Sequence, residues 1–121
     1  MNILCLEDDL TTQTMIEKLV KKLIPSATVE IENHAVKALL YSIINDPDFY
    51  ILDWSLPFFD TSYIIDKIAK QKKPILIYTA FDLEHVYNEI VKKCGSLPIG
   101  LTLCEKSDSA TLTNFIKQNI V

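Results

Sequence analysis

Glycine, arginine and long apolar runs are scarce or missing in this chain, and each absence narrows what the protein can be. Only 2 of the 121 residues are glycine and 49% are hydrophobic, so the composition favours a packed core over disorder. All 12 basic residues are lysine and the net charge is −4, which argues against a general nucleic-acid-binding surface. No apolar run approaches the length of a membrane-spanning helix.

Cysteine is also sparse. The 3 cysteines are an odd count with no CxxC spacing. Cys5 and Cys104 lie inside apolar segments, where we expect them to be small core residues. The chain begins directly with a strand-like segment, so we expect no signal peptide, a cytoplasmic location and a single domain over residues 1–121.

Short apolar runs of strand length recur along the chain and predict five β-strands. They cover residues 2–6, 28–31, 48–53, 74–79 and 99–104. The first, third and fourth runs are apolar almost throughout, which is typical of parallel strands that are covered on both faces.

Each of these runs is followed by apolar residues at a spacing of three to four, which predicts a helix with one buried stripe. Pro25 ends the first helix, Asn33 is a candidate N-cap of the second, and the third follows residues 60–62. Asp82 and Gly95 bound the fourth. The predicted stripes are Met15, Ile16, Leu19, Val20, Leu23 and Ile24; Val36, Leu39, Leu40, Ile43 and Ile44; Ile64, Ile65, Ile68 and Ala69; Val86, Tyr87, Ile90 and Cys94; and Leu112, Phe115, Ile116 and Ile120.

The alternation of five strands with five helices predicts an α/β fold of the (βα)5 type. Right-handed crossovers then give a doubly wound parallel five-stranded sheet. In such a sheet, reactive groups lie at the carboxyl ends of the strands. Four predicted strands end next to chemically useful side chains: Glu7 and Asp8, Asp53, Thr79, and Lys106.

These residues resemble those of the receiver domain of two-component response regulators, and the resemblance extends over the whole chain. It is carried by Glu7-Asp8, by Asp53 within Leu52-Asp53-Trp54-Ser55-Leu56-Pro57, by Thr79-Ala80 and by Lys106. The resemblance implies a flavodoxin-like strand order, 2-1-3-4-5. It also implies that Asp53 accepts a phosphoryl group from a sensor histidine kinase or phosphotransfer protein, and that this alters a protein-binding surface. The chain would be no enzyme beyond its own phosphorylation and dephosphorylation.

A carboxylate that attacks phosphorus needs the phosphoryl charge to be neutralised, and Mg²⁺ does so through oxygen ligands. Asp8 and Asp53 can supply carboxylates directly, and we expect Glu7 to act through a bound water. The resemblance adds the main-chain carbonyl of Ser55 as a further ligand. The expected cofactor is therefore Mg²⁺, held by Glu7, Asp8, Asp53 and Ser55.

The resemblance also assigns roles toward the phosphoryl group and sets limits on the partners. Lys106 would pair with one phosphoryl oxygen as a compact charge, and Thr79 would donate its hydroxyl to another. We expect a downstream protein partner, without direct nucleic-acid or membrane binding.

Some residues near the site are expected to have ordinary structural roles, and others depart from the receiver pattern. Asp9 is expected to cap a helix rather than to bind metal, since a run of three acidic residues cannot all point inward. Trp54 is expected to be a packing or rim residue. Leu103 stands where receivers often carry an aromatic residue, Ser107 where they carry proline, and Thr61 where they carry glycine.

Two alternatives stay open. The first, which the Leu103 and Ser107 departures motivate, is a protein-binding module that uses the receiver fold without phosphorylation. The second is a hydrolase with a phosphoaspartyl intermediate, although Ser55 stands where such enzymes usually carry a second carboxylate. Phe58 and Phe59 are expected to form part of a docking surface, because adjacent aromatic residues in a loop do not easily both enter the core.

Overall fold

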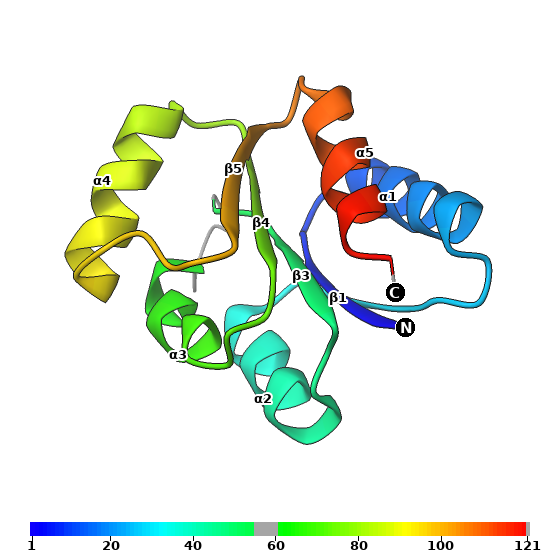
Figure 1. The fold of residues 1–121 in the computed structure, drawn as a ribbon, viewed down its shortest axis with the longest axis horizontal. Helices are drawn as coiled ribbons and strands as arrows, with labels where there is room; N and C mark the ends of the chain where they lie inside the picture. The colour runs from blue at the N-terminus through cyan, green and yellow to red at the C-terminus, as the bar shows by residue number, and fades with distance from the viewer. Residues whose placement is uncertain (55–60, 121) are drawn as a thin grey trace.

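The computed structural model describes residues 1–54 and 61–120, and in this part of the chain it forms one parallel five-stranded sheet (Figure 1). The strands are β1 (Asn2–Leu6), β2 (Thr28–Glu32), β3 (Phe49–Leu52), β4 (Ile75–Thr79) and β5 (Leu101–Glu105). All neighbouring pairs are parallel and the order is β2-β1-β3-β4-β5. The predicted fold class and strand order are therefore confirmed.

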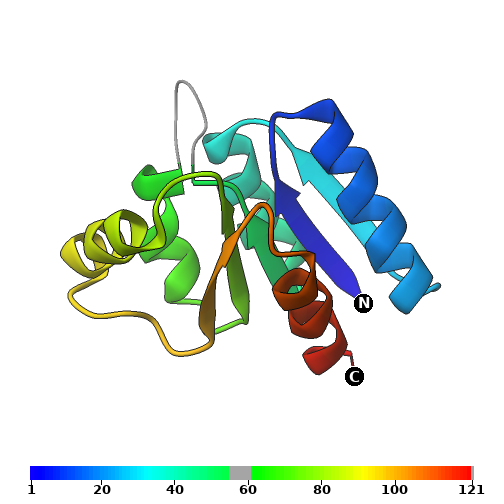
Figure 2. The ribbon, with the colours of Figure 1, turned by 90° about the horizontal axis from the view of Figure 1, so that it is seen from above.

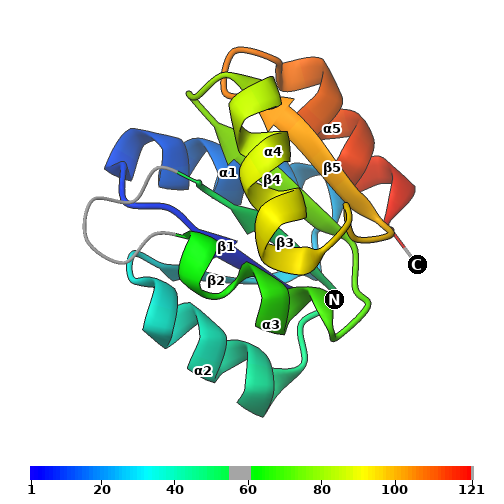
Figure 3. The same cartoon turned by 90° about the vertical axis from the view of Figure 1, so that its left-hand side faces the viewer.

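Helices cover both faces of the sheet (Figure 2). Helices α1 and α5 pack on one face, and α2, α3 and α4 pack on the other (Figure 3). Their bounds are α1 (Leu10–Leu23), α2 (Ala35–Asn45), α3 (Ile65–Ala69), α4 (Leu83–Cys94) and α5 (Ser109–Gln118), with a 3₁₀ turn, η1, at Thr61–Tyr63. Among the described residues, no helix is both long and apolar enough to pass through a membrane.

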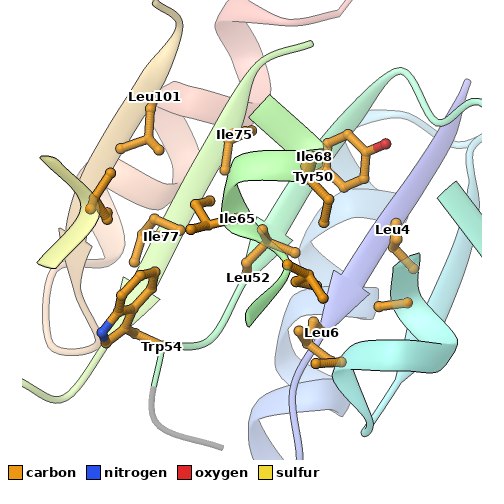
Figure 4. Close-up of a cluster of buried hydrophobic side chains, with 14 of the residues drawn as sticks. Leu4, Leu6, Tyr50, Leu52, Trp54, Ile65, Ile68, Ile75, Ile77 and Leu101 are labelled. Carbon is orange, nitrogen blue, oxygen red and sulfur yellow. The ribbon is translucent and has the colours of Figure 1, made fainter. Parts of the chain in front are cut away.

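The central strands are buried on both faces, as their continuous apolar sequence predicts. One set of alternating side chains packs under α2, α3 and α4, and the other packs under α1 and α5. On the second face the ring of Phe49 meets that of Phe115 edge-on, with centroids 5.5 Å apart. The first set, shown in Figure 4, comprises Leu4, Leu6, Tyr50, Leu52, Ile75 and Ile77, and the second comprises Ile3, Cys5, Phe49, Ile51, Leu76 and Tyr78.

The third and last helices differ from the periodic prediction. The segment after residue 60 is not one regular helix, because the 3₁₀ turn Thr61–Tyr63 precedes a five-residue α3. Helix α5 ends at Gln118, so the prediction that Ile120 completes its buried stripe is wrong, and Ile120 is exposed. The fifth strand starts two residues later than predicted, which leaves Ile99 98% exposed.

The predicted buried stripe of α2 is also wrong. Ala35, Ala38 and Ser42 face the sheet, whereas Val36, Leu40, Ile43 and Ile44 are exposed. Both sides of α2 are apolar, so periodicity alone could not decide which side packs on the sheet. Met15 of α1 and Tyr87 of α4, at the edges of their stripes, are likewise exposed.

The helix ends depend on specific side chains. The predicted N-cap Asn33 is wrong, because Nδ1 of His34 accepts the Val36 N–H at 3.2 Å. Asp9 caps α1 as predicted, accepting the Thr12 N–H at 2.9 Å. Gly95 ends α4 in the left-handed conformation, with φ of 84°, as expected of a helix C-terminal glycine.

Candidate functional site

The parallel sheet brings four predicted site residues to one edge. Glu7 follows β1, Asp53 follows β3, Thr79 ends β4, and Lys106 follows β5. Main-chain hydrogen bonds fix these positions: the Asp53 N–H donates to Leu6 O at 2.8 Å, and the Lys106 N–H donates to Thr79 O at 2.9 Å. The ladder therefore holds the acidic and basic groups in register with each other.

The Lys106 ammonium lies between two buried carboxylates. Its Nζ is 2.9 Å from Oε1 of Glu7 and 3.3 Å from Oδ2 of Asp53. The two carboxylate side chains are 1% and 2% exposed, whereas that of Lys106 is 25% exposed. Glu7, Asp53 and Lys106 thus form one contiguous ionic cluster.

Two carboxylates that share one cation leave an excess of negative charge. Burial, together with a hydrogen bond to Asp53, raises the pKa of Glu7 to about 7, although Lys106 acts in the opposite direction. Burial alone would lower the pKa of Lys106, but the two carboxylates outweigh it and raise this pKa. The cluster therefore favours a further positive charge at this edge.

The donor set fits a hard divalent cation. Carboxylate oxygens of Glu7, Asp8 and Asp53 lie within 4.8 Å of one another. Oε1 of Glu7 is buried, and the Lys106 Nζ lies 2.9 Å from it in an ion pair that does not meet hydrogen-bond geometry. Clustered oxygens of this kind are the ligands that Mg²⁺ takes. The predicted fourth ligand, the main-chain carbonyl of Ser55, lies outside the described residues, as do Phe58 and Phe59.

The three consecutive acidic residues take three different environments. Glu7 is the innermost, and its Oε2 accepts the Asp8 N–H at 3.0 Å. The Asp8 side chain is exposed at the rim, while Asp9 turns away to cap α1. The expectation that the run divides its roles is confirmed for Asp9.

Thr79 is fully buried and lies beside a surface hollow of about 390 Å³ that is also lined by Phe81, Lys106 and Ser107. Its Oγ1 accepts the Phe81 N–H at 3.0 Å. The hydroxyl hydrogen of Thr79 can therefore point to an acceptor in the site. The peptide bond from Lys106 to Ser107 is trans.

Trp54 connects the site to α4, and the sequence did not reveal this connection. Its indole is 3% exposed, packs in the core shown in Figure 4, and donates Nε1–H to Oε2 of Glu89 at 3.0 Å. Oε1 of Glu89 lies 2.8 Å from Nε2 of His85, whose ring meets that of Phe81 at 6.3 Å. The packing role predicted for Trp54 is confirmed, and the residue beside Asp53 is thereby tied to α4.

Thr61 is a second contact that the sequence did not reveal. Its side chain is fully buried, and its hydroxyl donates a hydrogen bond to the main-chain oxygen of Asp53. The threonine at the position where receivers carry glycine therefore holds the strand end that presents the Asp53 carboxylate. Leu103, another departure from the receiver pattern, is partly buried and packs against the core.

Comparisons with known proteins agree with this architecture. No protein-family model matches the chain, and no curated protein matches it in sequence. Among solved structures, it is similar to the signal receiver domain of a DNA-binding response regulator from Colwellia psychrerythraea, with 24% identity and a TM-score of 0.80 over 97% of this chain and 95% of that one. The BeF3-activated N-terminal receiver domain of RstA from Klebsiella pneumoniae is 22% identical, with a TM-score of 0.74 over 98% of this chain and 100% of that one.

A CheY-like response regulator receiver domain from Methanospirillum hungatei extends this likeness to more distant sequences. It is 15% identical, with a TM-score of 0.72 over 98% of this chain and 94% of that one. At these identities the similarity establishes the fold. The resemblance to receiver domains is therefore confirmed in three dimensions across nearly the entire chain.

Proposed function

We propose that this chain is a phosphorylation-controlled signalling domain, in which Asp53 accepts a phosphoryl group from a sensor histidine kinase or phosphotransfer protein. The observation that carries the proposal is the contact of Lys106 Nζ with the buried Glu7 and Asp53 carboxylates, beside the Asp8 carboxylate. A merely structural ion pair does not need a third carboxylate at the rim. An acceptor site for a phosphoryl group does, because it must also hold a cation.

The transfer would begin with attack of one Asp53 carboxylate oxygen on phosphorus. A P–O bond to Asp53 forms as the P–N bond to the donor histidine breaks, and the electron pair of that bond leaves with the imidazole. Lys106 is placed to offset the negative charge on a phosphoryl oxygen, and Thr79 can donate its hydroxyl to another. Mg²⁺, held by Asp8 and Asp53 with Glu7 behind them, would neutralise phosphoryl charge.

Mass spectrometry of the intact protein after incubation with acetyl phosphate tests this function. We expect a gain of one phosphoryl group that requires Mg²⁺ and is absent with EDTA. Asp53→Asn should abolish the gain, because an amide oxygen is a poor nucleophile, whereas Asp66→Asn on α3 should leave it intact. Full labelling of the Asp53→Asn variant would show that the acceptor is another residue.

Two acidic neighbours provide a sharper control on the metal. Asp8→Asn should greatly weaken Mg²⁺-dependent labelling, since it removes a carboxylate from the rim of the cluster. Asp9→Asn should leave labelling nearly intact, because Asp9 is engaged in capping α1. Equal losses of labelling in the two variants would contradict the assignment of Asp8, rather than Asp9, as the metal ligand.

The second candidate function is a protein-binding module that uses the same fold without phosphorylation. Leu103 and Ser107 favour it, because both depart from the receiver pattern in the segment that carries Lys106. The same labelling experiment separates the two, since this candidate requires that no Mg²⁺-dependent gain occurs. Under either candidate we propose a cytoplasmic protein whose output partner is another protein.

A further inference from the structure

The three members of the ionic cluster share a main-chain feature: the carbonyl oxygen of each accepts a hydrogen bond from a side chain of another element. Nε2 of Gln13, on α1, donates to Glu7 O at 2.7 Å. The Tyr78 hydroxyl, on β4, donates to Lys106 O at 2.8 Å. A hydroxyl of η1 donates to Asp53 O in the same way. We call these three bonds the carbonyl anchors.

The main-chain N–H groups of the same three residues are held as well. They donate to main-chain oxygens of neighbouring strands, at 2.9, 2.8 and 2.9 Å: from Glu7 to Glu32, from Asp53 to Leu6, and from Lys106 to Thr79. Because a residue has only two soft backbone dihedrals, hydrogen bonds on both of its peptide units fix the direction of its Cα–Cβ bond. The point from which each charged side chain starts is therefore set from both sides.

Bonds of this kind are concentrated at the cluster. In the described part of the chain, the other hydrogen bond from a side chain to a main-chain carbonyl more than four residues away joins Asn2 Nδ2 to Asn45 O, and it is longer, at 3.4 Å. Burial raises the pKa of Tyr78, so its hydroxyl keeps the proton that it donates. A buried carbonyl needs some partner, but that need alone does not direct most long-range bonds of this kind to one cluster.

Two of the carbonyl anchors stand where the chain departs from the receiver pattern. Thr61 occupies a position where receivers carry glycine, which has no side chain to make the bond. Tyr78 binds the carbonyl of the peptide unit that joins Lys106 to Ser107, where receivers carry proline. A proline ring restricts the backbone of its own residue, and serine does not. The Tyr78 hydroxyl therefore restrains a segment that lacks this ring.

We propose that Gln13, Thr61 and Tyr78 are positioning residues that hold the ionic cluster in the arrangement needed for phosphoryl transfer. This inference rests on the proposed function. Catalysis of phosphoryl transfer depends mainly on the placement of the reacting and charged groups. Tyr78 acts through the main chain of Lys106, whereas Gln13 and Thr61 act through the main chains of the two buried carboxylates that would hold Mg²⁺.

Tyr78→Phe tests the anchor on the cation, since it removes one hydroxyl and keeps the packed ring. At saturating Mg²⁺ and acetyl phosphate, the initial rate of Asp53 labelling should fall about two- to ten-fold, the range given by one net hydrogen bond. The Mg²⁺ concentration for half-maximal rate should not change, because Lys106 is no metal ligand. The control Tyr50→Phe removes another buried hydroxyl, which is bonded to Gln71, and should leave both quantities as in wild type.

Thr61→Val tests the anchor on the phosphoacceptor, since it keeps the branched shape and loses the hydroxyl. The Mg²⁺ concentration for half-maximal rate should rise about two- to ten-fold, because the Asp53 carboxylate is a proposed ligand. Gln13→Met should act in the same direction through Glu7. Thr61→Ser keeps the hydroxyl and should restore wild-type labelling. Ser42→Ala removes a buried hydroxyl that is bonded within α2 and should have no effect.

Amide hydrogen exchange gives a readout that does not depend on phosphorylation. Tyr78→Phe should speed exchange of the Lys106 N–H, and Thr61→Val should speed exchange of the Asp53 N–H, each by about two- to ten-fold. Each variant should leave the other N–H unchanged, because the loss is local. Equal acceleration at both positions would indicate a general loss of stability and would overturn the positioning role.

The labelling experiment separates failure of this inference from failure of the proposed function. Wild type that takes up no phosphoryl group would remove the proposed function and this inference with it. Wild type that is labelled, with Tyr78→Phe and Thr61→Val indistinguishable from it, would overturn this inference alone. An equal loss in Tyr50→Phe, or no recovery in Thr61→Ser, would also overturn it. If Thr61→Val does not fold, Thr61→Ala takes its place and is read by the same criteria.

Discussion

Charged residues are usually exposed and large apolar residues are usually buried. The ionic cluster at the sheet edge departs from the first rule, and the outer face of α2 departs from the second. At the sheet edge, Glu7 and Asp53 are charged groups that are almost completely buried. On α2, large aliphatic side chains such as Ile43 and Ile44 are exposed. Buried charge is costly unless it is paired, whereas exposed apolar surface costs the monomer little. The buried charges of the cluster must therefore be paired within the fold, whereas the exposed apolar side chains of α2 need no compensation in the monomer.

Removal of Lys106 should cause the largest loss of stability. In Lys106→Met, two buried carboxylates would lose their only close cation among the described residues. Removal of one partner of a buried pair costs about 3–5 kcal/mol, and we expect the lower end because the Lys106 side chain is 25% exposed. Urea unfolding with EDTA at pH 8 measures it. The control is Lys117→Met, at an exposed site of α5, which should change stability by less than about 0.5 kcal/mol. Equal losses in the two variants would mean that Lys106 does not stabilise the buried carboxylates.

The buried charge of Glu7 should also make stability depend on pH, with a smaller effect than the loss of Lys106. The pKa of Glu7 is raised from 4.5 to about 7, so the folded state binds the proton more tightly than the unfolded state does. Glu7 therefore favours folding below pH 4.5, and this contribution is lost as pH rises through about 7. In EDTA, the free energy of unfolding of wild type should fall between these pH values relative to Glu7→Gln. Parallel pH profiles of the two proteins would show that folding does not raise the pKa of Glu7.

The sequence predicted the sheet well and the helix faces less well, for a physical reason. Strands such as β1 and β3 are buried on both sides, so their apolar runs are unambiguous. Helix α2 is apolar on both sides, and its burial depends on how closely the helix can approach the sheet. Small residues such as Ala38 permit that approach, and a scale of hydrophobicity ranks them below the leucine and isoleucine that remain outside.

At the site, the strand-end rule brought together Glu7, Asp53, Thr79 and Lys106 before any geometry was known. It could not predict the Thr61 hydroxyl on Asp53 or the Trp54 contact with Glu89. Both contacts join residues whose spacing carries no periodic signal. They depend on where the 3₁₀ turn and α4 pack, which only the tertiary structure supplies.

The inward face of α2 gives the next prediction. Ala38→Leu should destabilise the monomer by about 1–3 kcal/mol, because the added atoms would force α2 away from the sheet. Thermal or urea unfolding measures this. Asn88→Leu, at an exposed position of α4, adds a large side chain without crowding and is the control. A neutral Ala38→Leu would mean that α2 is not closely packed on the sheet.

The outward face of the same helix should give the smallest change. Ile44 is 77% exposed, so Ile44→Ala removes few contacts from the monomer. Alanine also has the higher helix propensity, so the variant should unfold within about 0.5 kcal/mol of wild type and could be slightly more stable. Ile116→Ala removes the same atoms from a fully buried position on α5 and should cost about 2–5 kcal/mol. Similar losses in the two variants would place Ile44 in the core.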